Sequence, residues 1–356
     1  MLTPRKLPRP RAAAILAGVA GLMMAASCTT DTPTEAADDT AERDDQLSEQ
    51  CQEAVIPELP ELPAVSEGTG TQTVTGVDGE AEVPVAPQAA LGMYTTDVDI
   101  LAWLRYPLAS SQPIRGDGGY TTFPCFFPQD ALADVSTFAN YPEYDYESIL
   151  MAEPDFILNG LGYDPDVVAR LPEIAPTYNV DAFDGRSWME HFEETAAALG
   201  RSQYYEEWKA IYDARIAEVA AEIDDPASIT VAPVGYWEDQ FQTGCYAGVE
   251  CQVFDDLGLT IAPTSLENNR EGEALSGEQL GKMDGIDYAF MIRGLGEEEE
   301  AVFQSTLDEA AQNPLWADLD FVQNEDGIVG YEFEMTFGSP SGQLAFLDVV
   351  EQALAS

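Results

Sequence analysis

The 356-residue sequence has little positive charge and almost no histidine. It holds 15 Lys and Arg residues against 65 Asp and Glu, and its single histidine is His191. A chain this acidic repels nucleic acid and is not attracted to an anionic lipid surface, so both are excluded as partners. A site for free zinc or manganese needs several histidine ligands, and the sequence has neither these nor a CxxC pair. His191 lies among glutamates, and we expect it on the surface.

Common catalytic motifs are also missing. The sequence contains no phosphate-binding GxxxxGK[ST] and no HExxH. The segment GSPSG at 338–342 has proline at the position where a nucleophile elbow needs its serine. We therefore predict that the protein is not an enzyme and carries neither a resident metal nor a cofactor.

The N-terminus has no apolar run long enough for a membrane-spanning helix. Its uncharged run at 12–26 is about 15 residues, short of the roughly 20 that cross a bilayer. Four basic residues precede this run, and Cys28 follows small residues. This pattern predicts a lipoprotein signal peptide at 1–27, with lipid on Cys28 anchoring the mature chain to the outer face of the cell membrane. The alternative is an ordinary signal peptide in which Cys28 is incidental.

Residues 28–68 are rich in Thr, Asp, Glu and Pro and poor in large apolar side chains. Such a segment cannot bury enough surface to fold, so we predict an acidic disordered tether. Removing the signal peptide leaves 11 basic residues against the same 65 acidic ones, a net charge of −54. We interpret most of these acids as a solvated, mutually repelling surface.

Beyond Cys28 the chain has four cysteines, namely Cys51, Cys125, Cys245 and Cys251. An even number in an exported protein favours two disulfides. Four cysteines allow three connectivities. The short spacing between Cys245 and Cys251 favours pairing these two, which leaves Cys51 to join the tether to Cys125.

The rest of the chain alternates short apolar strands with helices. A hairpin is expected at 71–85 around Asp78-Gly79. Strands are expected at 89–93, 156–158, 177–180, 229–234, 288–292 and 327–331. Helices are expected at 97–105 with Asp97 as its cap, then at 146–152, 165–170, 253–257, 277–283 and 343–354, with another starting at 313. This alternation indicates parallel sheets covered on both faces.

One long helix interrupts the alternation. Trp208, Tyr212, Ile216, Val219 and Ile223 recur at helical spacing, which predicts one amphipathic helix over 201–223. We therefore expect an α/β fold of two Rossmann-like lobes with parallel sheets, joined by a long rigid helix, with a ligand cleft between the lobes. The predicted boundaries are an N-terminal lobe at 69–186, a helical linker at 187–226 and a C-terminal lobe at 227–356.

Several segments together resemble a known family. They are YESILMAEPDFIL at 146–158, LG at 199–200, DDLGL at 255–259, SGEQLGKMDGIDYAFMI at 276–292, NPLWADL at 313–319, GIV at 327–329 and FG at 337–338. In this order they resemble the substrate-binding proteins of iron-siderophore and cobalamin ABC importers, over roughly residues 70–355.

The resemblance implies an extracytoplasmic, monomeric protein that captures a ferric siderophore and delivers it to a permease dimer. Glu147 and Glu278 match the acidic residues with which this family docks on the permease. Cobalamin or haem is the alternative ligand within the same class. A surface lipoprotein without a transport function is the alternative from a different class.

Ligand contacts are expected from aromatic and cationic side chains on loops that follow strands, because guanidinium groups suit oxygen-rich chelates. The alternative for each residue is packing or plain surface exposure. The candidates are Tyr94, Arg115, Tyr120 and Phe123 in the first lobe and Tyr236, Trp237, Arg270, Arg293, Tyr331 and Phe337 in the second.

Overall fold

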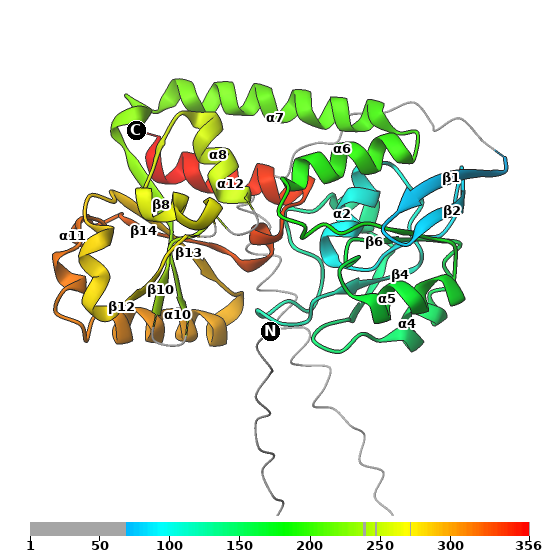
Figure 1. Cartoon of the computed structure of the whole chain (residues 1–356), viewed down its shortest axis with the longest axis horizontal. Coiled ribbons are helices and arrows are strands. Elements are labelled where there is room, and N and C mark those ends of the chain that lie inside the picture. Colours follow the sequence, from blue (N-terminus) through cyan, green and yellow to red (C-terminus); the bar gives the residue numbers. More distant parts are fainter. Residues whose placement is uncertain (1–68, 238–239, 246–247, 271, 356) are drawn as a thin grey trace, which may run out of the picture. The chain divides into compact units, whose positions relative to one another are not determined.

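The computed structural model describes residues 69–237, 240–245, 248–270 and 272–355. The predicted signal peptide, the tether, Cys28 and Cys51 lie outside these residues. Figure 1 shows an α/β fold in which two groups of strands are separated along the chain by two helices. We call the part before these helices the first lobe and the part after them the second lobe. The domain boundaries given above stay predictions.

The first lobe is built on parallel strands. β6 is its central strand, and all four of its residues, FILN, are buried. It pairs with β3 on one side and β7 on the other, in parallel. A second parallel pair, β4 and β5, was not predicted, and β1 and β2 form the expected antiparallel hairpin. The bounds are β1 Thr71–Gly76, β2 Gly79–Pro84, β3 Ala90–Gly92, β4 Ser111–Ile114, β5 Ser136–Ala139, β6 Phe156–Asn159 and β7 Thr177–Asn179.

The second lobe has a four-stranded parallel sheet in the order β11-β8-β13-β14. Beside it lies a small antiparallel sheet in the order β12-β10-β9, which the sequence did not lead us to expect. The bounds are β8 Thr230–Pro233, β9 Gly235–Trp237, β10 Gln240–Gln242, β11 Thr260–Ile261, β12 Ala274–Ser276, β13 Tyr288–Arg293 and β14 Ile328–Glu332.

Four of the described α-helices begin after a residue whose side chain accepts hydrogen bonds from the free N–H groups of the first turn. The Asp145 carboxylate accepts from the Ser148 N–H at 3.0 Å and starts α4. Ser339 does the same for α12, followed by Pro340 at the first helical position. The bounds are α2 Thr95–Trp103, α3 Gln129–Leu132, α4 Tyr146–Met151, α5 Pro165–Arg170, α6 Trp188–Ala198, α7 Ser202–Glu222, α8 Val249–Leu257, α9 Pro263–Leu266, α10 Gly296–Ala310, α11 Asp320–Gln323 and α12 Pro340–Leu354.

The long helix α7 confirms the expected helix over 201–223 to within one residue at each end. Its first half packs on α6, where the Trp208 ring lies 5.2 Å from that of Trp188. Its second half faces α8 and α12 of the second lobe (Figure 1), with the Tyr212 hydroxyl 2.8 Å from Asp256 and Arg215 paired with Asp348 at 3.0 Å. Because α7 also contacts α2 of the first lobe, one helix is packed against both lobes.

The start of α12 joins the lobes a second time. We call this place the α12 junction and define it by Asp99, Trp103, Trp188, Ser341 and Gln343. Asp99 on α2 is fully buried and accepts from the Ser341 N–H at 2.7 Å and its hydroxyl at 2.8 Å. Trp103 donates to the same hydroxyl at 2.8 Å, and Trp188 donates to Gln343 at 2.9 Å. These bonds are shielded from water and hold α2 and α6 against α12.

Asp97 does not cap α2 as predicted. The helix begins at Thr95, and Asp97 lies within its first turn. Its buried carboxylate accepts from the N–H groups of Tyr94 at 3.1 Å and Gly160 at 2.9 Å. Asp97 therefore ties the start of α2 to the end of β6. The sequence could not show this because Gly160 is distant along the chain.

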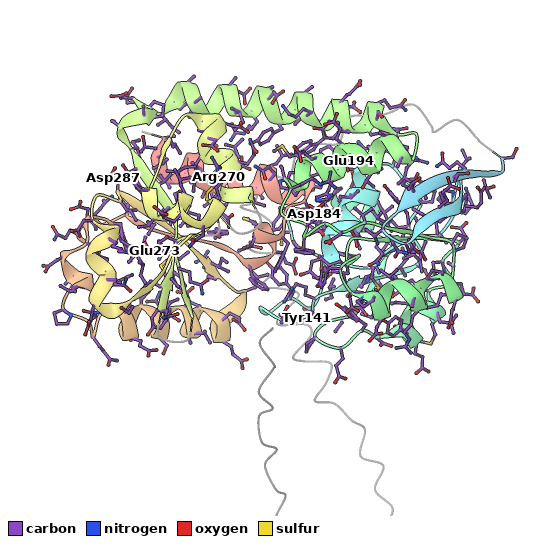
Figure 2. All side chains as sticks on the ribbon, viewed as in Figure 1. Tyr141, Asp184, Glu194, Arg270, Glu273 and Asp287 are labelled. Carbon is purple, nitrogen blue, oxygen red and sulfur yellow. A yellow bond between two sulfur atoms is a disulfide. The ribbon has the colours of Figure 1, made fainter. Side chains whose placement is uncertain are left out.

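The prediction that His191 is a surface residue is wrong. His191 is 3% exposed, because it shares the buried face of α6 with Trp188 and Thr195. Its Nε2 lies 3.0 Å from Asp184, which also pairs with Arg186 at 2.8 Å. Arg186 pairs in turn with Glu194; Asp184 and Glu194 are labelled in Figure 2. The prediction was based on the neighbouring glutamates, but these lie on the opposite, exposed face of the helix.

Cysteine pairing follows the prediction where the structure describes it. Cys245 and Cys251 form a disulfide with their Cα atoms 5.7 Å apart. Cys125 is also disulfide-bonded, while its predicted partner Cys51 lies outside the described residues. Within the described part of the chain, no helix combines the length and apolar character needed to cross a membrane.

Candidate functional site

A cavity of about 420 Å³ lies where strand ends from both lobes meet. In parallel sheets, the loops that follow the carboxyl ends of the strands gather at one edge, where ligands bind. Here β13 ends at Arg293, β8 leads into Val234, and the loop after β4 supplies Asp117 and Gly118. The lining consists of Asp117, Gly118, Val234, Gly235, Tyr236, Gln242, Met291, Ile292, Arg293, Gly294, Glu299, Val302, Phe303, Thr306 and Phe333.

The cavity wall is mainly apolar and aromatic, with few charges. Its charged side chains are Asp117, Arg293 and Glu299. Arg293 is about half exposed, and its guanidinium lies 3.6 Å from the carboxylate of Glu300. The side chain of Glu299 lies over the backbone of Gly294, where a Cβ would come within 2.7 Å of it. A wall of this kind suits a bulky organic ligand.

Arg115 lies beside the cavity but is held by the protein. Its Nε and one terminal nitrogen donate to the two oxygens of Asp117 at 2.8 and 2.6 Å, and it also donates to the Tyr94 hydroxyl. Its guanidinium lies over the ring of Tyr141, labelled in Figure 2, at 4.0 Å and over the Phe337 ring at 4.7 Å. Burial alone would lower the pKa of Arg115, but the hydrogen bonds to Asp117 and Tyr94 raise it above its usual value. Arg115 is therefore a permanent, internally neutralised cation.

The loop at 117–120 connects the lobes directly, and we call it the bridging loop. The Leu295 N–H donates to the Gly118 carbonyl at 2.8 Å, and the Tyr120 hydroxyl donates to Glu332 at 3.0 Å. Gly119 has a φ of +84°, and a Cβ there would lie 2.1 Å from the Leu295 carbonyl oxygen. The close approach therefore requires glycine at this position.

Sequence reasoning missed Glu334, the most unusual acid near the site. Its side chain is 2% exposed, and neither carboxylate oxygen has a hydrogen-bond partner within the described residues. Burial raises its pKa to about 8, although the nearby Arg115 opposes the rise. The alternation of acids and aromatics in the segment YEFEMTF at 331–337 was the available signal, because this segment runs from the end of β14 into the loop that follows it.

Four predicted ligand residues come together around this cavity. Tyr236 and Arg293 line it, Arg115 lies against Asp117 at its edge, and Tyr120 holds the bridging loop. The rings of Tyr94 and Phe337 pack edge to face behind Arg115, with centroids 5.7 Å apart. Trp237 belongs to β9, and its side chain lies outside the described part of the structure.

Three other candidates lie away from the cavity lining. Tyr331 is buried in the core, where it donates to Glu250 and packs on Phe346 at 4.9 Å. Phe123 is buried and stacks on Phe127. Arg270, labelled in Figure 2, is half exposed and pairs with Asp255 of α8 at 2.7 Å. Val302 and Phe303, which were not among the candidates, line the cavity. They belong to α10, a helix that the sequence pattern did not predict.

The two predicted docking acids are both exposed. Glu147 lies in the first turn of α4, and Glu278 lies in the 3₁₀ helix Gly277–Met283. On α4, the exposed side chains of Leu150 and Met151 follow Glu147 at helical spacing. Among the described residues, no group of three or more His, Cys, Asp or Glu side chains is arranged to hold a metal ion.

Comparison with known proteins gives a consistent picture. The model of the periplasmic binding protein family matches residues 93–329. A periplasmic solute binding protein from Mycobacterium smegmatis superposes with a TM-score of 0.62 and 20% identity, over 80% of this chain and 98% of that chain. No curated protein sequence matches.

Two further solved structures share the fold. SirA of Staphylococcus aureus, complexed with staphyloferrin B, superposes with a TM-score of 0.61 and 21% identity, over 79% of this chain and 97% of its own. PiaA, an iron uptake ABC transporter substrate-binding protein from Streptococcus pneumoniae, has a TM-score of 0.56 and 16% identity, over 80% of this chain and 99% of its own.

Proposed function

Because the chain belongs to the periplasmic binding protein family, we propose that it captures a ferric siderophore outside the cytoplasm and delivers it to the permease of an ABC importer. It binds the chelate intact between the lobes, so that the chelator and not the protein surrounds the iron. It acts by binding alone, as a monomer, without catalysis and without a resident cofactor. This family works in the extracytoplasmic space, which agrees with the predicted export signal.

The observation that carries this proposal is the cavity to which both lobes contribute. Its aromatic and aliphatic walls, including Tyr236, Phe303 and Phe333, match the organic shell of a chelate. The complex of SirA with staphyloferrin B and the iron uptake role of PiaA point in the same direction.

The test is a titration of the purified mature protein followed by tryptophan fluorescence. We expect saturable quenching by at least one ferric chelate among hydroxamates and catecholates. Saturable binding of cobalamin or haem with no response to any ferric chelate would replace the siderophore by that ligand. No saturable response to any of these compounds would favour a surface lipoprotein without a transport role.

We further propose that lipid on Cys28 anchors the protein to the outer face of the cell membrane. The support is the sequence from Arg5 to Cys28, with its basic start and short apolar run. We expect Cys28→Ala to move the protein from the membrane fraction to the soluble extracytoplasmic fraction, measured by fractionation and immunoblot. Thr30→Ser, a nearby change outside the predicted signal peptide that keeps the cysteine, is the control. A Cys28→Ala protein that stays in the membrane fraction would disprove the anchor.

A further inference from the structure

We propose that the cavity selects ferric chelates that are uncharged or cationic, as hydroxamates are, over anionic catecholates. This inference rests on the proposed function and names the ligand class of the same site. The charges around the cavity and the partners that already bind its arginines disfavour an anionic ligand.

The cavity wall carries more negative than positive side chains. Asp117 and Glu299 are acidic, Arg293 is basic, and the other lining residues are uncharged. Asp117 is offset by Arg115, to which it forms two hydrogen bonds. Glu299 has no ion-pair partner within the described part of the chain, so the wall around it is electronegative.

The arginines near the site are already engaged. Arg115 is 8% exposed and bound by Asp117 and Tyr94, so a ligand anion would have to displace these partners. Arg293 faces Glu300 at 3.6 Å, and it also acts on Glu332, since it opposes the rise that burial causes in the pKa of that carboxyl. Arg270 is paired with Asp255 outside the cavity lining. Among the described residues at the cavity, neither Arg115 nor Arg293 is therefore left unopposed to receive an anionic ligand.

The charge of a ferric chelate depends on the chelating groups. Three hydroxamates, each a monoanion, neutralise the ferric ion, and a pendant ammonium makes the complex cationic. Three catecholates, each a dianion, give a trianionic complex. Placing a trianion against the unpaired Glu299 in a partly desolvated cavity is unfavourable without free cations to pair with it. The whole mature chain, at −54, also repels an approaching anion.

The experiment compares ferric desferrioxamine B, a cationic trihydroxamate, with ferric enterobactin, a trianionic tris-catecholate, by tryptophan fluorescence quenching at physiological salt. We expect the hydroxamate to bind at least about tenfold more tightly, which is the ratio that one unfavourable charge contact of roughly 1.4 kcal/mol produces. The variant Glu299→Lys should reduce this preference by about tenfold or more, because it places a cation in the wall.

Glu298→Lys is the matched control. Glu298 is the preceding residue of α10, is exposed and is absent from the cavity lining, so its substitution changes the net charge equally without altering the wall. At physiological salt the Debye length is about 8 Å, so the charge of this exposed residue is screened from the ligand. We expect the affinities of Glu298→Lys for both chelates to stay close to wild type. Tighter binding of the catecholate to the wild type would overturn the charge inference and leave the proposed function intact. Equal effects of the two lysine variants would show that this cavity is not the site. Binding of neither chelate, nor of any other ferric chelate, would instead overturn the proposed function.

Discussion

The double variant Glu147→Lys, Glu278→Lys will lose most iron uptake while its affinity for the ferric chelate stays within about twofold of wild type. Charge pairs across protein interfaces couple by several kcal/mol, and reversing two of them should reduce transport by about tenfold or more. This expectation rests on the proposed delivery to a permease, which must engage both lobes of the binding protein.

Both acids are held on short helical turns with buried neighbours. On α4, Asp145 caps the turn and Ile149 is fully buried. In the 3₁₀ helix, the Ser276 hydroxyl and N–H are bonded to Gln279, and Leu280 is fully buried. The two carboxylates make no ion pair within the part of the chain that the structure describes. Their substitution by lysine should therefore leave the fold unchanged, with an effect on the free energy of unfolding below about 0.5 kcal/mol.

Uptake is measured with radioactive iron chelate in cells that express each variant as the sole copy, and affinity is measured on the purified proteins. Glu206→Lys, Glu222→Lys is the control, because both residues are exposed on α7 and the change in net charge is the same. Normal uptake by the Glu147/Glu278 variant would remove these residues from docking. Equal loss in the control would assign the effect to net charge rather than to a docking contact.

The second large effect is a loss of stability as the pH rises from 5 to 8. Burial raises the pKa of Asp97 and of Asp99 to about 7 and that of Glu334 to about 8. In the unfolded chain these carboxyls titrate near pH 4. Between these values the folded protein keeps protons that the unfolded chain releases, so the free energy of unfolding falls as the pH rises. The stability that these protonated carboxyls contribute is fully present below about pH 4. It is lost as the pH rises through their pKa values in the folded protein.

This change in stability with pH is large compared with the usual free energy of unfolding of a protein domain. Each of these carboxyls lowers the free energy of unfolding by up to roughly 1.4 kcal/mol per pH unit, in the pH range between its unfolded and its folded pKa. Three groups together should lower the free energy of unfolding by several kcal/mol between pH 5 and 8, a substantial share of the 5–15 kcal/mol that is typical of domains. Urea denaturation at each pH measures it.

Single variants identify the groups responsible. Asp99→Asn should flatten the pH profile, since an amide has no proton to release, and should lower stability at pH 5 more than at pH 8. Asp130→Asn, at an exposed acid, should leave the profile parallel to wild type. A wild-type stability that increases from pH 5 to 8 would contradict the assignment of raised pKa values to these carboxyls.

The elements that could be predicted from sequence are those with a local signal. β6 is a buried apolar run bounded by Pro154 and Gly160, and α7 repeats its apolar residues at helical spacing, so both were located closely. The antiparallel strands β9, β10 and β12 have three residues each, too few to show an alternating pattern. α10 begins with a run of glutamates and is mostly exposed, so it lacks the apolar stripe by which helices are recognised.

The site was harder to predict, because its residues are defined by contacts between distant segments. Arg115 was named from the sequence as a candidate and lies beside the cavity, but its neutralisation by Asp117 and Tyr94 depends on geometry. Tyr331 follows the same strand-end pattern as Tyr236, yet its side chain points to Glu250 in the core. Successive side chains of a strand point to opposite faces, so a shift of one residue decides whether a side chain points to the cavity or to the core.

The α12 junction has a consequence for how this chain can be divided into modules. Asp99 and Trp103 belong to the first lobe, but their buried partner Ser341 comes from the last helix of the chain. A gene fragment that ends before α7 would encode the complete sheet of the first lobe and still leave a buried carboxylate and an indole without their hydrogen-bond partners. We therefore expect such a fragment to be less stable than the whole described chain, and recombination between relatives should succeed when α2 and the start of α12 are inherited together.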